Sequence, residues 1–286
     1  MISVCMIVKN EEAMLAECLQ SVAGADEIIV CDTGSTDRTV EIAERYGARI
    51  CHYEWTDHFA DARNAAIAHA ACDYILVIDA DERLDPGGID ALRAYHTDDA
   101  YYIKIHSCMG EWEHDAARYF RNDPEIRFVG RIHETLNIHP KVLVDVFITA
   151  YHSPAHEQDP NRNIRVLTKC LEDEPGNSRW HYYLAREYFY RQDMAKAEQL
   201  FLECINASEW SGEIEDALLY VARCRWHQHK GDKAREACLQ ALGMNPNFKE
   251  AAYFMAEMSW EHNKPPWLAM AKAGNNNGVV FRRYRS

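Results

Sequence analysis

Short apolar runs alternate with polar loops and with segments whose apolar residues recur at helical spacing along the first half of the chain. Runs rich in Val and Ile favour buried strands, whereas helical spacing favours helices with one face in a core. The expected strands cover residues 2–8, 27–31, 49–53 and 74–78, and the expected helices cover 15–22, 39–46 and a segment around 61–64. Ser35 or Thr36 is the expected N-cap of the second helix. This alternation predicts a mainly parallel, three-layer α/β sheet.

Two aspartates, Asp79 and Asp81, follow the apolar run at residues 74–78. Because side chains alternate along a strand, both are expected to point the same way, toward the space beyond the carboxyl edge of the sheet. Ligands bind at this edge in open α/β sheets. Two carboxylates there suit Mg²⁺ or Mn²⁺ holding a diphosphate. Solvated turn residues are the alternative that this pattern alone leaves open.

Four motifs, in order along the chain, resemble those of the family-two nucleotide-sugar glycosyltransferases with the GT-A fold. They are Met6-Ile7-Val8-Lys9-Asn10-Glu11-Glu12, Asp32-Thr33-Gly34-Ser35-Thr36-Asp37, Phe59-Ala60-Asp61-Ala62-Arg63-Asn64 and Asp79-Ala80-Asp81. Further on, Gly130-Arg131-Ile132-His133-Glu134 and Tyr151-His152 resemble a bacterial and phage group in which tetratricopeptide-like helices follow the catalytic domain. That group includes peptide S-glycosyltransferases. The resemblance is close over residues 1–155 and loose beyond them; a different metal-dependent enzyme on the same sheet is the alternative.

The resemblance implies a nucleoside diphosphate sugar as donor, with UDP as the nucleotide. Asp32 matches the aspartate that recognises the base, and a carboxylate can accept a hydrogen bond from the imide N–H of uracil. The backbone of Ile7 and Val8 would flank the base. Arg63 matches a position that contacts the diphosphate or the ribose, and a guanidinium suits phosphate. From the residues alone, Asp32 could equally cap a helix, and Arg63 could form a surface salt bridge.

The resemblance also implies a metal site made by Asp79, Asp81 and His152 and loaded with Mn²⁺ or Mg²⁺. Asp81 is the expected direct ligand, and Asp79 is expected beside the ribose and the metal, so both also count as nucleotide-sugar contacts. His152 matches a late histidine that completes the site from behind the D-x-D segment, although a lone histidine can equally be structural. The cation would stabilise the departing diphosphate, which makes Asp81 part of the catalytic machinery.

The expected reaction is inverting transfer of a hexosyl or related sugar, in which a base takes the proton of an attacking hydroxyl or thiol. Glu134 is the first candidate for this base, because it lies beyond the nucleotide-binding half of the sequence. The reserve candidates are Glu111, Glu113 and His133. The segment 115–128 is expected either to gate the acceptor or contact phosphate, or to be an ordinary solvated loop. Its basic residues are Arg118, Arg121 and Arg127.

The composition changes near Asp159-Pro160-Asn161, after which strand signals end and Ala, Leu, Tyr and Glu become frequent. Small residues then recur at a fixed spacing, as in tetratricopeptide helix pairs. Ala185, Ala197 and Cys204 are followed after 37 residues by Ala222, Ala234 and Ala241. A leading helix is expected at 161–173 and helix pairs at 179–207, 213–242 and 248–272, the last interrupted at Pro265 and Pro266. The expected domains are 1–155 (GT-A), 160–275 (helical repeats) and 276–286 (a basic tail).

Aromatic residues and the basic tail each allow two interpretations. Tyr182, Tyr183 and Tyr188 are expected to fill the seam between paired helices together with Leu200 and Phe201, or else to line a peptide-binding groove. The tail Arg282-Arg283-Tyr284-Arg285 could reach the diphosphate or the acceptor, or be a frayed end.

Composition narrows the setting in which the protein is expected to work. The net charge of −14 disfavours non-specific binding to nucleic acid or to anionic membranes. Ten scattered cysteines without a C-x-x-C pair indicate reduced thiols rather than disulfides or zinc. The sequence starts directly with a strand, shows no signal-peptide pattern and has no run that could span a bilayer. A cytoplasmic protein is therefore expected, and a homodimer is compatible with both domain types.

Three functions are consistent with these features. The first is a metal-dependent glycosyltransferase that modifies a protein or peptide, with the helical repeats holding the acceptor. The second has the same chemistry but acts on an envelope saccharide, a lipid-linked intermediate or a modified DNA base. The third is a non-catalytic repeat scaffold, against which the presence of Asp32, Arg63, Asp79 and Asp81 together argues, because a scaffold has no need of them.

Overall fold

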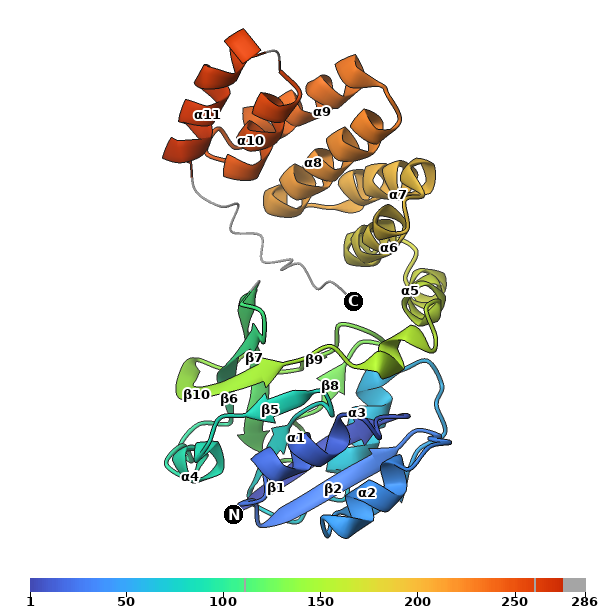
Figure 1. Ribbon diagram of the computed structural model, residues 1–286, viewed down its shortest axis with the longest axis vertical. Helices are drawn as coiled ribbons and strands as arrows, with labels where there is room; N and C mark the ends of the chain where they lie inside the picture. Colours follow the sequence, from blue (N-terminus) through green and yellow to red (C-terminus); the bar gives the residue numbers. More distant parts are fainter. Residues whose placement is uncertain (111, 260, 275–286) are drawn as a thin grey trace. The chain divides into compact units, whose positions relative to one another are not determined.

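The computed structural model describes residues 1–110, 112–259 and 261–274. The chain divides into two compact units, one made by residues 1–162 and one that begins at Asn163 (Figure 1). Glu111, one of the reserve bases, and the basic tail expected at 276–286 lie outside the described residues.

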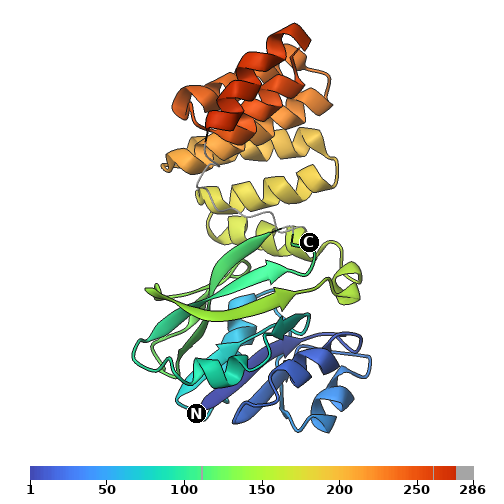
Figure 2. The ribbon, with the colours of Figure 1, turned by 60° about the vertical axis from the view of Figure 1, so that its left-hand side comes forward.

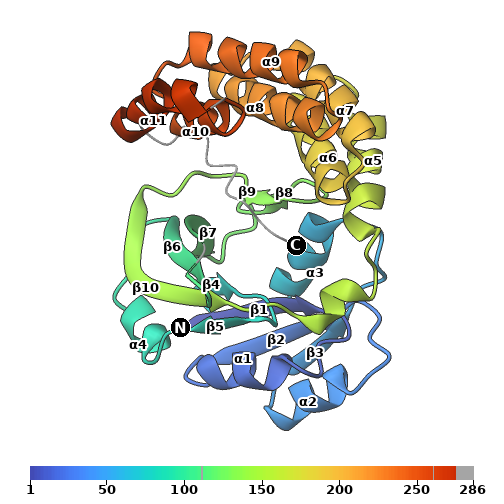
Figure 3. The same ribbon diagram turned by 45° about the horizontal axis from the view of Figure 1, so that its top comes forward.

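The first unit is built on an eight-stranded sheet in the order β3–β2–β1–β4–β7–β6–β10–β5. The strands β3, β2, β1 and β4 are parallel neighbours, as Figure 3 shows. Beyond them β7 runs antiparallel, β6 and β10 are parallel to each other, and β5 closes the sheet antiparallel to β10. The bounds are β1 Ile2–Val8, β2 Glu27–Asp32, β3 Arg49–His52, β4 Tyr74–Val77, β5 Glu82–Leu84, β6 Ala100–Ser107, β7 Glu113–Arg121 and β10 Val142–Ala150. A separate ribbon joins β8 Phe128–Val129 to β9 Thr135–Leu136.

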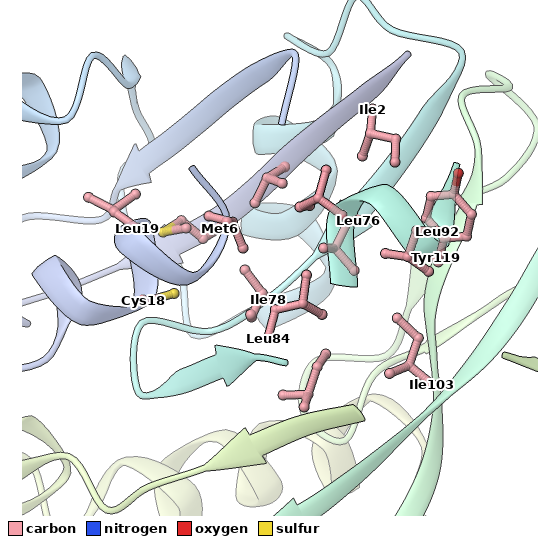
Figure 4. Close-up of a cluster of buried hydrophobic side chains, with 14 of the residues drawn as sticks. Ile2, Met6, Cys18, Leu19, Leu76, Ile78, Leu84, Leu92, Ile103 and Tyr119 are labelled. Atoms are coloured by element: carbon pink, nitrogen blue, oxygen red, sulfur yellow. The ribbon is translucent and has the colours of Figure 1, made fainter. Parts of the chain in front are cut away.

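Helices cover both faces of this sheet, which confirms the predicted three-layer α/β arrangement. On one face, alternate residues of β1 such as Met6 join a core with Leu19 of α1 and Leu92 of α4 (Figure 4). On the other face, Cys5 of β1 packs with residues of α3, including Ala66. The helices are α1 Leu15–Ser21, α2 Thr39–Arg45, α3 Phe59–Ile67 and α4 Gly88–Leu92. Because both faces are buried, the central parallel strands β1 and β4 are almost entirely apolar.

Two local expectations were wrong. The N-cap of the second helix is Arg38, and the Oδ1 of the preceding Asp37 accepts the Thr39 N–H at 3.0 Å, whereas Ser35 lies several residues earlier and accepts the Asn10 N–H. The D-x-D residues do not continue the strand: β4 ends at Val77, and the Glu82 N–H donates to the Asp79 carbonyl at 3.0 Å in a turn. Strand alternation therefore does not orient Asp79 and Asp81.

The second unit consists of helices that pack in consecutive pairs (Figure 2). The leading helix and all three predicted pairs are confirmed, and the small residues at the repeat positions, such as Ala185 and Ala222, are fully buried where helices meet. Pro265 and Pro266 do not interrupt the last pair. They occupy the first turn of its second helix, where the missing N–H of proline costs nothing. The helices are α5 Arg162–Asp173, α6 Ser178–Tyr190, α7 Met194–Ala207, α8 Ser211–His227, α9 Gly231–Met244, α10 Lys249–Glu257 and α11 Lys264–Ala273.

The tyrosines that were expected either to fill the helix seam or to line a peptide-binding groove differ in their burial. Tyr182 is fully buried and packs edge-on against Phe201 of α7, as expected for the helix seam, whereas Tyr183 and Tyr188 are only partly buried. Within the described ranges, every helix is too short or too polar to cross a membrane.

Candidate active site

The loops that follow β2, β1 and β4 lie next to one another at one edge of the sheet. Val8 at the end of β1 is in register with Asp32 at the end of β2. On the other side of β1, the Ile78 N–H donates to the Cys5 carbonyl and carries the chain from β4 to Asp79. Parallel strands thus bring motifs that are far apart in the sequence to a single edge.

Arg63 is the centre of a buried charge network at this edge. Its helix, α3, places the guanidinium so that Nη1 and Nη2 donate to the two carboxylate oxygens of Asp79 at 2.7 and 3.2 Å, while Nε donates to Glu134 at 2.5 Å. The Arg63 side chain is 8% exposed and that of Glu134 is 11% exposed. Although burial acts to raise it, Arg63 and Arg118 hold the pKa of Asp79 well below its usual range. A bidentate pair of this kind is both strong and directional.

Arg118 is the second cation of the network. It extends from β7, and its Nη2 donates to Asp79 and to Glu82, each at 3.1 Å. Glu82 in turn accepts the backbone N–H of Asp79 at 2.8 Å. The interpretation of segment 115–128 as a solvated loop was wrong for its first half, which is strand. The sequence analysis did not assign Glu82 a role, although it directly follows the D-x-D motif.

The charges of several neighbouring carboxylates act on Asp81. Burial, followed by the charges of Asp79, Glu82 and Glu11, raises the pKa of Asp81 to about 8. Glu11, from the loop after β1, is 8% exposed, and burial raises its pKa as well. Carboxylate oxygens are the donors that Mg²⁺ and Mn²⁺ prefer, and such ions usually combine one or two carboxylates with phosphate oxygens of the substrate, so the chemistry of Asp81 fits a divalent cation.

His152 follows β10, which brings it back to the D-x-D turn. The Tyr151 N–H donates to the Asp81 carbonyl at 2.9 Å, so the neighbouring residue of His152 is fixed to the turn. The His152 side chain is 61% exposed, and its Nε2 lies 3.6 Å from Glu157. Over residues 1–110, 112–259 and 261–274, no three His, Cys, Asp or Glu side chains are grouped as a metal site. The metal role of Asp79, Asp81 and His152 therefore stays a prediction.

The Asp32 carboxylate accepts backbone hydrogen bonds from the loop that follows it. Its Oδ2 accepts the Gly34 N–H at 3.2 Å and its Oδ1 the Ser35 N–H at 3.0 Å, and it is 6% exposed. The Val8 carbonyl accepts both the N–H and the hydroxyl of Thr33, at 2.9 and 3.0 Å. Asp32, Ile7 and Val8 are thus held together at the ends of adjacent strands, as binding of one base by all three requires.

The candidate bases are not equivalent in the structure. Glu134 belongs to the Arg63 network, whereas Glu113 lies on β7 with a side chain 61% exposed and 3.3 Å from Lys104. His133 has a left-handed backbone with φ of 52°. Glu134 is the candidate that is both shielded from water and adjacent to Asp79.

Comparisons with known proteins show which proteins the chain is similar to. The chain is 40% identical over 169 residues to a TPR repeat-containing protein of Synechococcus elongatus, a match that covers 57% of this chain and 39% of that protein. It is 30% identical over 201 residues to the SPbeta prophage-derived glycosyltransferase SunS of Bacillus subtilis, covering 64% of this chain and 48% of that protein. The chain thus spans less than half the length of these two relatives.

Among solved structures, S. aureus TarS 1–349 in complex with UDP-GlcNAc aligns with a TM-score of 0.48 at 16% identity, covering 82% of this chain and 88% of that one. The model of the glycosyl transferase family 2 domain matches residues 3–150, more than half of the chain. The chain therefore belongs to glycosyl transferase family 2 and combines its GT-A sheet with a C-terminal helical region.

Proposed function

We propose that this protein transfers a sugar from a UDP-linked donor to a protein or peptide side chain, with inversion at the anomeric carbon and with a divalent cation. The observation that carries the proposal is the meeting of Asp32, the Arg63–Asp79 pair and Asp81 at one sheet edge within a family 2 domain. The similarity to a relative named as a glycosyltransferase, SunS, supports sugar transfer as the class of reaction.

Asp81 and His152 are the residues proposed to hold Mn²⁺ or Mg²⁺. When bound, the cation would neutralise charge that develops on the departing diphosphate. Asp79 has both oxygens engaged by guanidinium groups. We therefore assign Asp79 mainly to anchoring Arg63 and Arg118 beside the phosphates, and secondarily to the metal. Those two cations would stabilise the leaving group without reorganisation, because the network already fixes them.

Glu134 is proposed to take the proton of the acceptor. The bond from Arg63 Nε fixes one of its oxygens, which orients the carboxylate, and its low exposure limits competition by water. Because Glu134 also accepts a hydrogen bond from Arg63, its role as a base has to be tested separately from this contact.

The first helices of the repeat pairs carry arginine–aromatic stacks. On α6, the Arg186 guanidinium stacks over the rings of Tyr182 and Tyr190 at 5.9 and 5.6 Å. On α8, Arg223 stacks over Tyr220 at 5.4 Å and over Phe254 of α10 at 5.8 Å.

Partner-less polar atoms lie on the same helices. In the described part of the chain, Arg186 Nε and Glu250 Oε2 are buried without a hydrogen-bond partner. The two atoms lie on separate helices, α6 and α10, so the peptide acceptor is proposed on the resemblance to the peptide S-glycosyltransferases and not on these atoms.

The deciding experiment measures release of UDP from a panel of UDP-sugars with purified protein and Mn²⁺, alongside thermal shifts with each ligand. Donor consumption that is lost in Asp81→Asn, and a ligand-dependent rise in melting temperature, are the expected results. A protein that neither binds nor consumes any nucleotide sugar would instead be a scaffold. If saccharide, lipid-linked or DNA acceptors receive the sugar and peptides do not, the proposed acceptor is wrong, whereas the proposed donor and reaction still hold.

A further inference from the structure

The segment after β10, residues 151–158, is held against the loop after β1 and the turn after β4 by three hydrogen bonds that lie on either side of His152. It begins where the Tyr151 N–H bonds the Asp81 carbonyl at 2.9 Å. It ends where Gln158 Oε1 accepts from Asn10 Nδ2 at 2.7 Å. Between these points, the Ser153 hydroxyl donates to Glu11 Oε2 at 2.6 Å. His152 therefore lies between two residues whose positions are set by other loops.

The Glu11–Ser153 bond is the buried part of this fastening. Ser153 is 1% exposed and Glu11 is 8% exposed. The Ser153 hydroxyl also accepts the Ala155 N–H at 3.1 Å, which caps the short 3-10 helix at Pro154–Glu157. Glu11 is itself held by its N–H, which donates to Thr39 Oγ1 at 2.8 Å. A hydrogen bond to a buried carboxylate is short and costly to break.

Asn10 connects the same segment to the loop after β2. Its φ of 56° is left-handed, a conformation that Asn tolerates better than most residues. In this conformation its Oδ1 accepts the Thr36 N–H at 2.8 Å while its Nδ2 reaches Gln158. The loops after β1, β2 and β10 are thus interlocked around the carboxylates near Asp81.

We infer that Glu11 and Ser153 are positioning residues whose hydrogen bond fixes the backbone of His152 next to the D-x-D turn and thereby sets the affinity of the site for a divalent cation. This inference rests on the proposed function. Outer residues that orient a metal ligand commonly change metal affinity by about 10- to 100-fold when they are removed. Ordering the His152 backbone in advance removes an entropic cost that binding would otherwise include.

The test compares Ser153→Ala with Ser3→Ala as a matched control. Ser3 is also fully buried, donates to a glutamate (Glu27, 2.7 Å) and accepts a backbone N–H (Cys72, 3.1 Å), but it lies at the opposite, amino-terminal end of β1. Binding of Mn²⁺ alone is measured by electron paramagnetic resonance titration of the full chain. UDP release is then measured as a function of Mn²⁺ concentration.

Ser153→Ala is expected to weaken Mn²⁺ binding by about 10-fold, while kcat at saturating Mn²⁺ and the affinity for UDP without metal stay at wild-type values. Ser3→Ala is expected to lose similar stability with unchanged Mn²⁺ affinity. Gln158→Ala changes an exposed residue and should therefore still fold. Its affinity for Mn²⁺ is expected to fall by less than that of Ser153→Ala.

Wild-type Mn²⁺ affinity in both Ser153→Ala and Gln158→Ala overturns the inference alone. A wild-type protein that binds neither Mn²⁺ nor Mg²⁺ overturns the proposed metal site and the inference with it.

Discussion

Arg63 binds Asp79 through both terminal nitrogens of its guanidinium, and its remaining Nε is taken by Glu134. All three guanidinium nitrogens of this buried cation thereby have a partner within the protein, and three of its five N–H groups are used. The pair joins helix α3 to the turn after β4, so the residues expected to meet the donor are also residues that hold the sheet edge together.

Replacing Arg63 by Met is expected to destabilise the protein by about 3–5 kcal/mol, because Asp79 and Glu134 would be left as buried charges with a missing partner. Urea unfolding measures the change. Arg45→Met is the control, since Arg45 forms a solvent-exposed pair with Glu41. Similar stability of the two variants would contradict a central role for Arg63.

The stability of metal-free protein is expected to fall as the pH rises from about 4 to about 8, in part through Asp81. An unfolded aspartate titrates near pH ~3.9, whereas the folded pKa is about 8, so the folded state binds the proton more tightly. The stability that this proton provides is complete below the unfolded pKa and is lost as the pH rises through the folded pKa.

Unfolding in EDTA at several pH values, for wild type and Asp81→Asn, isolates this contribution. The variant should gain stability relative to wild type as the pH rises, and Mn²⁺ should restore only the wild type. Parallel pH profiles for the two proteins would show that the Asp81 carboxylate is not crowded by its neighbours.

Glu134→Gln is expected to lower kcat by about 100-fold or more if Glu134 is the base. The amide oxygen can still accept from Arg63 Nε, so UDP affinity should change little. Glu113→Gln is measured in parallel because Glu113 is the other carboxylate among the candidate bases that the structure describes. A loss of UDP affinity with unchanged kcat would make Glu134 an anchor for Arg63 instead.

In the helical unit, Tyr182→Phe is expected to cost about 1–3 kcal/mol, because the buried carboxylate of Asp216 would lose the hydroxyl that donates to it. Tyr253→Phe, at a residue that is 42% exposed, is the control and should unfold at the wild-type denaturant concentration. Chemical denaturation followed by circular dichroism distinguishes them. Equal midpoints would place the Tyr182 hydroxyl outside the stabilising contacts.

The sequence was most informative where one local pattern determines the outcome. The apolar run at residues 2–8 is β1 because a strand buried on both faces needs apolar residues throughout. The helix pairs were predictable because small residues recur wherever two helices approach. The D-x-D turn was misread because an apolar run does not show where its last residues leave the strand.

The contacts that define the candidate site were less accessible from sequence. Arg118 reaches Asp79 only because β7 inserts beside β4 in antiparallel orientation, a pairing that no local pattern encodes. Ser153 has no distinctive neighbours, and its importance comes from Glu11, more than a hundred residues earlier. Side chains that act through long-range pairs lack the periodicity that makes strands and helices visible.

The position of β10 within the sheet limits how short a functional fragment can be. This strand lies between β6 and β5 rather than at an edge, so a chain cut before residue 142 would leave β5 with no hydrogen-bonding neighbour. A fragment cut soon after β10 would keep the sheet but lose Ser153 and Gln158. Truncated chains that are meant to isolate catalysis from the repeats should therefore retain at least residue 158, and truncation points on either side of it separate folding from metal affinity.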